Sequence, residues 1–457
     1  MAVTEQEPVA IEGFAGELVE PDHPSYDEVR RVHNGLVDKR PALIARARGT
    51  ADVVAALNAA RVHAWEVSIR GGGHNVAGTA VSDGGLMIDL SLMKGIHVDP
   101  AAKTVRAQGG VLWRELNRET QLHGLAVTGG AISTTGIAGL TLGGGLGWLM
   151  PKFGLAADNL LSVELVTADG SVLTVSADEH PDLFWGLRGG GGNFGVATSL
   201  EYRLHPVGPM ITGGLIAHPI EAAGDLLRFV RDFAGTVSDE VFLVAGVVHA
   251  PDGSGTPLSA VGVCHCGPLE QGEADLEPLI GFGSPALNMI GPMPYEAVNQ
   301  MLDDAYPRGA LNYWKSVFLS ELSDGAIDTM IEQFSSCPSP MTAMIVEHFH
   351  GEVTRIAVDA TAVPHRQPGF NLVITGEWMD PATTDANIAW TRETYDAFEP
   401  YAAHRRWLNY LPAEEADDDG LRAVFGPNYE RLVALKSKYD PDNVFHLNAN
   451  ISPVATL

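Results

Sequence analysis

The segment Ile69-Arg70-Gly71-Gly72-Gly73-His74-Asn75-Val76-Ala77-Gly78 carries the strongest structural signal in this chain. It follows an apolar and polar alternation over residues 65–69, which predicts a strand. Three consecutive glycines leave backbone N–H groups uncovered, so these groups can converge on an anion such as a pyrophosphate. A tight turn with a solvated histidine would have the same sequence, so the interpretation depends on the rest of the chain.

Length and composition describe a soluble globular protein of two domains. The chain has 457 residues, too many for one ordinary core, with 45% hydrophobic and 19% charged residues. No run approaches the roughly 18 apolar residues of a membrane span. Residues 1–21 lack a signal-peptide pattern, and three cysteines are too few for a disulfide framework, so we expect a cytoplasmic location. Cys264-His265-Cys266 lacks a second ligand pair, so we expect buried strand residues there and no metal site.

The charge balance argues against a nucleic-acid partner. The chain carries 29 basic and 57 acidic side chains, a formal net charge of −28, whereas nucleic acids are bound by basic surfaces. The acidic cluster at residues 414–419 is expected to be a solvated loop.

The N-terminal third predicts an α/β unit with an anion site at a strand end. We expect a helix over residues 26–38, a strand over 41–45, and a helix from Thr50, as N-cap, to Ala64. The strand at 65–69 and the glycine loop follow, which places the anion site there. Further strands are predicted over 85–90 and 104–108, with a helix over 112–123.

Two later glycine-rich regions indicate a flat ligand lying close to the backbone. The first runs from Thr128-Gly129-Gly130 to Gly143-Gly144-Gly145-Leu146-Gly147-Trp148, and its Leu, Ile and Trp residues distinguish it from a flexible linker. The second, residues 189–195, matches G-x-G-x-x-G. Alternation over 196–204 predicts a strand after it, whereas a dinucleotide fingerprint opens a helix, so we reject a Rossmann site.

Other signals divide the remainder of the chain. Residues 162–175 predict a hairpin around Asp169-Gly170. After Pro206 the glycine runs stop, and strands such as 240–249 alternate with helices to about residue 400. A helix over 428–439 is stopped by Pro441.

These features together resemble the berberine bridge enzyme-like FAD-linked oxidases, in particular their bacterial branch within the vanillyl-alcohol oxidase family. The resemblance rests on residues 70–78, on 128–148 with 154–159, on 189–196, and on Asn409-Tyr410, Asn428-Tyr429 and Tyr439-Asp440-Pro441. It implies an α+β, PCMH-type fold. The FAD domain would be discontinuous, over residues 1–206 and 408–457, and residues 207–407 would form a substrate domain with an antiparallel sheet over the flavin.

The resemblance also implies which residues hold FAD. The loop would wrap the pyrophosphate, and His74 would bond covalently to the 8α carbon of the flavin. Relatives with two covalent bonds carry a cysteine where Ile132 stands, so no cysteinyl link is expected. The residues carried over as FAD contacts are Arg70, Gly71, Gly72, Gly73, His74, Asn75, Gly78, Thr128, Gly129, Gly130, Gly136, Gly139, Asn159, Val196, Asn409 and Asn448.

The sequence offers two candidates for catalytic residues, Tyr410 and Lys315. A base near the flavin would take a proton from substrate O–H or N–H as hydride leaves. Tyr410 is the first candidate because related enzymes use a tyrosine there, although a packed structural tyrosine fits equally well. Lys315 would lower the pKa of the Tyr410 phenol if it lay close, but a solvated lysine is the plainer interpretation. Asn371, Val373 and Thr375 are expected to face the pocket, whereas Glu377 could equally lie behind it.

The chain is therefore predicted to be an FAD-dependent oxidase of a small organic substrate, an alcohol, an amine or a ring carbon. O2 would be the electron acceptor and H2O2 the product. One alternative is a flavin dehydrogenase that uses a quinone or another acceptor. Another is a catalytically silent protein that binds flavin or another ligand.

The first testable prediction concerns the flavin link. Acid-denatured wild type should keep its yellow colour with the protein, and the flavin-bearing tryptic peptide should contain His74. His74→Ala should still bind FAD but release it on denaturation, because the glycine loop still holds the pyrophosphate. Free FAD in the supernatant of denatured, fully loaded wild type would contradict a covalent link.

Overall fold

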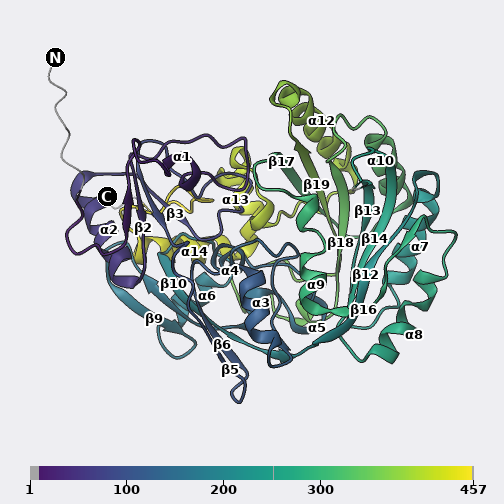
Figure 1. The fold of residues 1–457 in the computed structure, drawn as a ribbon, viewed down its shortest axis with the longest axis horizontal. Helices are drawn as coiled ribbons and strands as arrows, with labels where there is room; N and C mark the ends of the chain where they lie inside the picture. The colour runs from purple at the N-terminus through teal and green to yellow at the C-terminus, as the bar shows by residue number, and fades with distance from the viewer. Residues whose placement is uncertain (1–9, 251, 455–457) are drawn as a thin grey trace.

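The computed structural model describes residues 10–250 and 252–454. Within these residues, helices and strands alternate along the chain and the strands join into four sheets (Figure 1). Figure 1 places the first and last parts of the chain, in purple, blue and yellow, on one side and the green middle part on the other. The predicted mixture of helix and sheet is confirmed.

The first sheet carries the glycine loop at the end of a strand. Its spatial order is β1 Glu17–Val19, β2 Leu43–Arg46, β4 Leu86–Asp89 and β3 Val67–Arg70. The last three strands are parallel, and the helix α2 Thr50–His63 connects β2 to β3. The loop thus leaves β3 at the carboxyl edge of parallel strands, where open α/β sheets bind their ligands.

The second sheet is antiparallel and supports the two later glycine regions. Its spatial order is β5 Ile96–Asp99, β6 Thr104–Gln108, β10 Val196–Arg203, β8 Leu160–Val166 and β9 Val172–Ser176. The intervening helices are α3 Trp113–Gln121, α4 Ile137–Leu142, α5 Met150–Phe153 and α6 Pro181–Leu187, and β7 Leu125–Ala126 pairs with β11 His205–Pro206. The predicted hairpin is confirmed as β8 and β9. The third glycine run leads into strand β10, which confirms the rejection of a Rossmann helix.

The third large sheet has eight strands and belongs to the middle of the chain. Its strands are β12 Met210–Pro219, β13 Val241–His249, β14 Pro257–His265, β15 Leu287–Asn288, β16 Gly291–Pro294, β17 Leu311–Leu319, β18 Ala343–Phe349 and β19 Gly369–Trp378. The helices between and after them are α7 Ala223–Ala234, α8 Leu269–Ile280, α9 Tyr295–Gln300, α10 Asp324–Phe334, α11 Glu352–Arg355 and α12 Thr384–Ala397. The path β13–β18–β19–β17 is antiparallel throughout.

The two faces of this sheet differ in what they contact. Leu372 and Ile374 of β19 join a buried cluster with side chains of α7, α8, α10 and α12. Successive side chains of a strand point to opposite faces, so Asn371, Val373 and Thr375 face away from these helices. Trp314, which is paired with Thr375, lines the same cavity as the glycine loop. The face of Asn371 and Thr375 is therefore turned toward the glycine regions.

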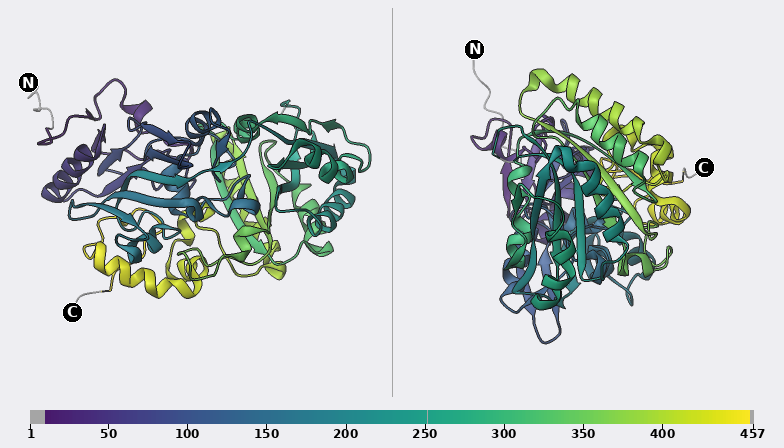
Figure 2. Two further views of the ribbon diagram at one scale, coloured as in Figure 1. Left: turned by 90° about the horizontal axis from the view of Figure 1, so that it is seen from below. Right: turned by 90° about the vertical axis from the view of Figure 1, so that its right-hand side faces the viewer.

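The C-terminal segment returns to the first part of the chain. It contains the short 3₁₀ turn η6 Leu408–Tyr410 and the helices α13 Asp418–Phe425 and α14 Tyr429–Tyr439. Leu432 and Leu435 of α14 share a buried cluster with Leu165 of β8 and Leu200 of β10. In Figure 2 the yellow helices lie beside the blue strands, on the side away from the purple segments.

Three local predictions need correction. The helix expected over residues 26–38 is only α1 Tyr26–Val29, because the following residues bond to the glycine loop and to β17 instead. Thr50 does not cap α2; its hydroxyl donates to Glu164 Oε1 at 2.5 Å. The acidic cluster is largely exposed, as expected, but it is not a loop throughout, since α13 begins inside it with Asp417 accepting from the Gly420 N–H at 2.8 Å.

Some expectations stay outside what the structure tests. The first nine residues of the segment 1–21, in which no signal-peptide pattern is seen, lie outside the described residues. Across the described part of the chain, no helix has both the length and the apolar composition needed to cross a membrane. The division at residues 206 and 408 remains a proposal about domain boundaries.

A buried ion pair ties the eight-stranded sheet to the second sheet. Arg366, just before β19, donates to both carboxylate oxygens of Asp158 at 2.7 and 2.8 Å. The two side chains are 1% and 6% exposed. Asp158 Oδ2 also accepts from the Leu155 N–H. Removing one partner of such a pair leaves a charge buried without compensation.

The second prediction follows from this pair. Asp158→Asn should lower the stability by about 3 kcal/mol, because Arg366 loses its counter-charge in a buried site. Glu430→Gln is the matched control, since Glu430 pairs with Arg422 in an exposed ion pair, and such pairs contribute about 0–1 kcal/mol. Thermal and denaturant unfolding would measure both variants. Equal unfolding midpoints would contradict the assigned importance of the buried pair.

Candidate active site

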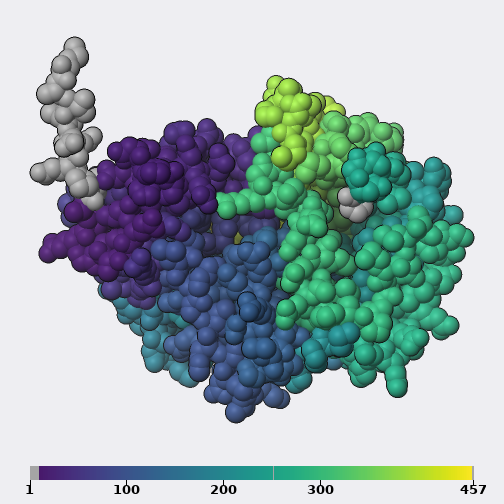
Figure 3. Space-filling view, viewed as in Figure 1, coloured from purple at the N-terminus to yellow at the C-terminus, as the bar shows by residue number. Residues whose placement is uncertain are grey.

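One cavity connects the three glycine regions, the C-terminal tail and the eight-stranded sheet. Its volume is about 310 Å³, within the range of small-molecule and cofactor sites. Figure 3 shows purple, blue and green segments meeting across this side of the molecule. Of the residues singled out from the sequence, the lining contains Gly71, Gly72, Gly73, His74, Asn75, Gly130, Gly136, Gly139, Val196, Asn409, Tyr410 and Asn448.

The glycine loop can line the cavity because it touches the second glycine region without side chains between them. A Cβ on Gly72 would lie 2.4 Å from the Gly136 nitrogen, and a Cβ on Gly136 would lie 2.4 Å from the Gly72 nitrogen. No real Cβ is tolerated at that distance from backbone. Gly73, with φ +67°, turns the chain so that His74 follows at the end of the loop.

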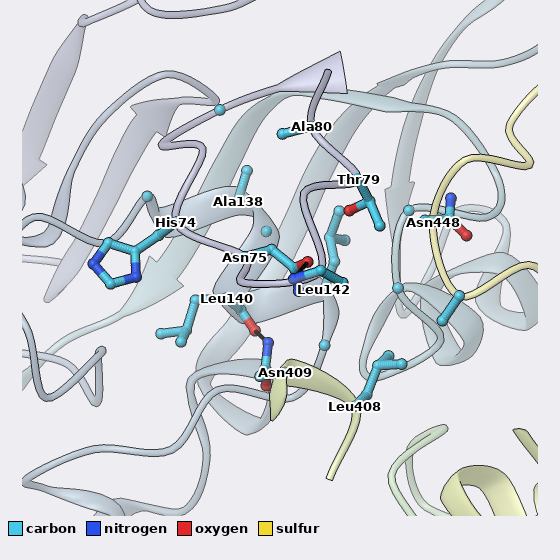
Figure 4. A pocket seen from close by; sticks show the side chains of 18 of the residues that line it. His74, Asn75, Thr79, Ala80, Ala138, Leu140, Leu142, Leu408, Asn409 and Asn448 are labelled. Carbon is cyan, nitrogen blue, oxygen red and sulfur yellow. Dashed lines mark hydrogen bonds between the residues drawn. The ribbon is translucent and has the colours of Figure 1, made fainter. Parts of the chain in front are cut away.

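The lining fits a long ligand with polar groups at both ends. Figure 4 places His74 at one end of the pocket and Asn448 at the other. His74 Nε2 and Asn448 Oδ1 are buried without a hydrogen-bond partner among the described residues. Buried polar atoms normally have partners, so these two atoms indicate groups that a ligand would satisfy. Glycine backbone between them suits close approach by FAD.

Several residues predicted to contact FAD have side chains engaged elsewhere. The Arg70 guanidinium donates to Asp89 at 2.9 and 2.5 Å and to backbone carbonyls of Val29 and Arg31. The Asn159 amide donates to two backbone carbonyls, and its oxygen lies 2.6 Å from His205 Nε2. Gly78, Thr128 and Gly129 are also absent from the lining. The Arg70 and Asn159 side chains thus bind other protein groups, and none of these five residues lines the cavity.

Asn409 joins the C-terminal turn to the second glycine region. Its amide donates to the Leu140 carbonyl at 3.2 Å, a contact drawn in Figure 4, and its oxygen accepts from the Gly145 N–H at 3.3 Å. Trp407 Nε1 donates to the same oxygen at 2.9 Å. A Cβ on Gly143 would lie 2.3 Å from the Asn409 amide nitrogen, so a glycine is required there.

The next residue, Tyr410, is hydrogen-bonded to a buried carboxyl group that sequence analysis missed. Tyr410 Oη donates to Glu347 Oε1 at 3.0 Å, and Asn371 Nδ2 donates to Glu347 Oε2 at 2.7 Å. Glu347 lies in β18 directly opposite Asn371 of β19, and paired residues share a face of the sheet. The carboxyl group is therefore oriented toward the tyrosine at the cavity.

Burial sets the protonation of this pair. Burial raises the pKa of Glu347 to about 7, even though hydrogen bonds from Asn371 and Tyr410 favour its charged form. Burial, followed by the nearby Glu347 charge, raises the pKa of Tyr410 well above its usual value of 10. A Tyr410 phenolate is thus strongly disfavoured, whereas Glu347 changes protonation near neutral pH.

Lys315 does not lie next to the Tyr410–Glu347 pair. Lys315 lies opposite Ile374, on the face that packs against the helices. Its ammonium group donates to Glu415, with Glu414 at 3.6 Å, and lies 5.0 Å from the centre of the Tyr395 ring. The prediction that Lys315 lowers the pKa of Tyr410 is not supported, because the sheet separates them.

Further aromatic rings and a second carboxyl group lie buried near the Tyr410–Glu347 pair. The Trp314 ring centre lies 5.4 Å from that of Tyr306 and 6.3 Å from that of Tyr410. Glu377 is fully buried, and neither of its carboxyl oxygens has a partner among the described residues. Burial raises its pKa to about 8. Its register places it on the face of Asn371 and Thr375.

Sequence matches connect this geometry to known proteins. The FAD binding domain family matches residues 41–176, and the berberine and berberine-like family matches residues 407–452. The (R)-6-hydroxynicotine oxidase of Paenarthrobacter nicotinovorans is 32% identical over 96% of this chain and 97% of its own. An uncharacterized FAD-linked oxidoreductase of Bacillus subtilis is 30% identical over 96% of this chain and 98% of its own.

Solved structures agree with the fold. The 6-hydroxy-D-nicotine oxidase of Arthrobacter nicotinovorans superposes with a TM-score of 0.88 at 31% identity, covering 96% of this chain and 98% of that one. The glucooligosaccharide oxidase of Acremonium strictum, with a TM-score of 0.85 and 24% identity, covers 96% and 98% and shares the fold. That enzyme is described with a 6-S-cysteinyl, 8α-N1-histidyl FAD.

The third prediction tests the cavity itself. Gly139 lies in α4 and lines the cavity, and a Cβ there meets no atom within 4 Å. In a His74→Ala background, so that FAD can be titrated, Gly139→Leu should fold but bind FAD roughly ten- to hundredfold more weakly, since overpacking costs about 1–3 kcal/mol. Gly224→Leu in α7 is the control, because its Cβ would meet the flexible end of Arg228 far from the cavity lining. If Gly139→Leu and Gly224→Leu bind FAD with equal affinity, FAD does not bind in this cavity.

Proposed function

Because the chain belongs to the berberine bridge enzyme-like family of FAD-linked oxidoreductases, we propose that it is an oxidase that removes a hydride from a small organic substrate and passes the electrons to O2. The single observation that supports the chemistry is the Tyr410–Glu347 pair at the cofactor cavity. When bound, FAD accepts the hydride at its N5 position.

The chain's own residues move the matching proton. Substrate O–H or N–H must lose a proton as C–H hydride leaves. Tyr410 lines the cavity and Glu347 lies behind it. The substrate proton passes to the Tyr410 oxygen while the Tyr410 proton moves to Glu347 Oε1. No free phenolate is needed in this relay, which agrees with the raised pKa of Tyr410.

Among alcohols, amines and ring carbons, amines are the first class to test. The relative at 32% identity is named for hydroxynicotine, a cyclic amine. The aromatic faces of Trp314 and Tyr410, which line the cavity beside the Glu347 carboxyl group, would attract a substrate that carries positive charge. This favours amines over sugars, whose binding relies on many hydroxyl partners.

We also propose one covalent flavin bond, through His74. It lines the cavity with an unpartnered ring nitrogen. Ile132, at the position expected for a cysteine in relatives with a second bond, packs with Tyr306 and Trp314 and cannot form a thioether. Thr135 also lines the cavity, and a residue of that size should leave O2 a path to the flavin.

The experiment that tests the proposed function is a screen with an anaerobic follow-up. Purified yellow protein is screened against amine, alcohol and sugar libraries for H2O2. Protein reduced by a hit without air is then mixed with air-saturated buffer, and the flavin should reoxidise quickly. Reoxidation over many minutes, with rapid bleaching of an added quinone, would favour the dehydrogenase alternative. Absence of flavin reduction by any library member would favour the silent binding protein.

The fourth prediction concerns the pH dependence of flavin reduction. Glu347 accepts a proton only when ionised, and its pKa of about 7 exceeds the usual value for glutamate. The anaerobic reduction rate at saturating substrate should therefore rise with pH, level off above about 7, and fall about tenfold per unit on the acid side.

Variants separate this proposal from its alternatives. Glu347→Gln and Tyr410→Phe should each slow reduction by roughly 10²–10⁴-fold, and the inflection near pH 7 should disappear in Glu347→Gln. The double variant should be no slower than the slower single one, because a relay fails as a unit. Lys315→Met, on the other face of the sheet, is the control and should keep the inflection. An unchanged inflection in Glu347→Gln would show that another group is the base.

A further inference from the structure

His74 is packed against a second histidine that the proposed chemistry does not use. The rings of His33 and His74 are stacked with centroids 3.8 Å apart and an interplanar angle of 19°. His33 is 5% exposed. Nε2 of His33, like that of His74, is buried without a partner among the described residues, so the two rings meet through their faces and share no hydrogen bond.

The backbone of His33 is held from two directions. Its N–H donates to the carbonyl of Gly73, the residue before His74, at 2.9 Å. Its carbonyl accepts from the Gly309 N–H at 2.9 Å. Next to it, the Asn34 amide donates to the Val76 carbonyl at 2.7 Å and to the Asn312 carbonyl of β17 at 2.9 Å. Residues 33–34 thus link the glycine loop to the eight-stranded sheet.

We propose that His33 is a positioning residue for covalent flavin attachment: its ring fixes the plane of the His74 imidazole so that a ring nitrogen points along the cavity at the flavin methyl group. This inference rests on the proposed His74 link. The fixed ring matters because misplacement of a reacting atom by about 1 Å can cost 10²-fold in rate.

The chemistry of attachment requires a neutral nucleophile. A bond forms between an imidazole nitrogen and the 8-methyl carbon, one proton leaves the imidazole, and one leaves the methyl group. The two electrons released remain with the flavin and are then taken by O2, which leaves with both protons as H2O2. Only a neutral imidazole has the nitrogen lone pair that this bond uses.

The groups around the stack keep both rings neutral. Burial and then the nearby His33 lower the pKa of His74 to about 3. Burial and then the Arg308 charge lower the pKa of His33 to about 4. Arg308 is held in place by its donation to the Arg31 carbonyl at 2.8 Å.

The test measures attachment and not turnover. Full-length protein is produced in riboflavin-depleted cells, mixed with FAD in air, quenched in acid at intervals, and assayed for flavin that stays with the chain. His33→Leu and His33→Gln, which lack a flat ring, should attach flavin roughly 10²-fold more slowly. His33→Phe keeps a flat ring that can stack on His74. Its rate of flavin attachment should therefore stay within about threefold of wild type, which corresponds to less than about 1 kcal/mol.

Controls separate the possible failures. Non-covalent FAD binding and the thermal unfolding midpoint are measured for every variant. Two variants without a ring, His33→Leu and His33→Gln, are used so that the test still stands if one of them fails to fold. His63→Leu is the matched control, because His63 stacks on Trp65 with centroids 4.5 Å apart, outside the cavity lining. His74→Ala fixes the baseline of zero attachment.

The outcomes are distinct. If the wild-type protein carries no covalent flavin, both the proposed His74 link and the proposed role of His33 are wrong. Covalent wild type with His33→Leu and His33→Gln reacting at the wild-type rate would leave the link in place and overturn the role of His33. His33→Phe as slow as His33→Leu would also overturn it, since stacking would then be insufficient.

Discussion

The close contact of Gly72 with Gly136 is the constraint on which the rest of the site depends. Backbone meets backbone there, and a Cβ on either residue would lie 2.4 Å from the opposite nitrogen. The contact brings the end of the parallel sheet to the start of α4, and both then form one wall of the cavity. A ligand at this wall meets main-chain groups, which explains how a chain with a net charge of −28 can hold an anionic cofactor.

The opposite side of the cavity depends on sheet register. Glu347 and Asn371 face each other across β18 and β19, and Tyr410 reaches Glu347 from a different part of the chain. A shift of either strand by one residue would turn these side chains toward the helices. The leucines and isoleucines that pack against those helices therefore also fix the polar pair. Burial then raises the pKa of Glu347 to about 7, although hydrogen bonds from Asn371 and Tyr410 favour its charged form.

Much of the fold could be predicted from the sequence, because glycine runs and strand alternation are local signals. Strand β10 after the third glycine run, and the hairpin of β8 and β9, follow from such signals. The hydrogen-bond partners of Arg70 and Asn159 could not be predicted in this way, because a polar side chain near a cofactor loop can bind either the cofactor or neighbouring protein groups. In the structure the Arg70 guanidinium binds Asp89, and the Asn159 amide binds the carbonyls of Phe153 and Leu155. Glu347 carries no sequence motif, and its role depends on a non-local contact with Tyr410 and on complete burial.

The return of the C-terminal segment to the first sheets has a consequence for how the protein is made. Asn409, Tyr410 and Asn448 line the cavity, yet they are synthesised long after the glycine loop at residues 71–73. Synthesis proceeds at about 5–20 residues per second and early domains fold first, so the glycine regions wait many seconds for the segment that closes their cavity. The cavity is therefore complete only after residues 409–448 have been made, and a chain cut short before them would expose an open cavity to the cell's proteases.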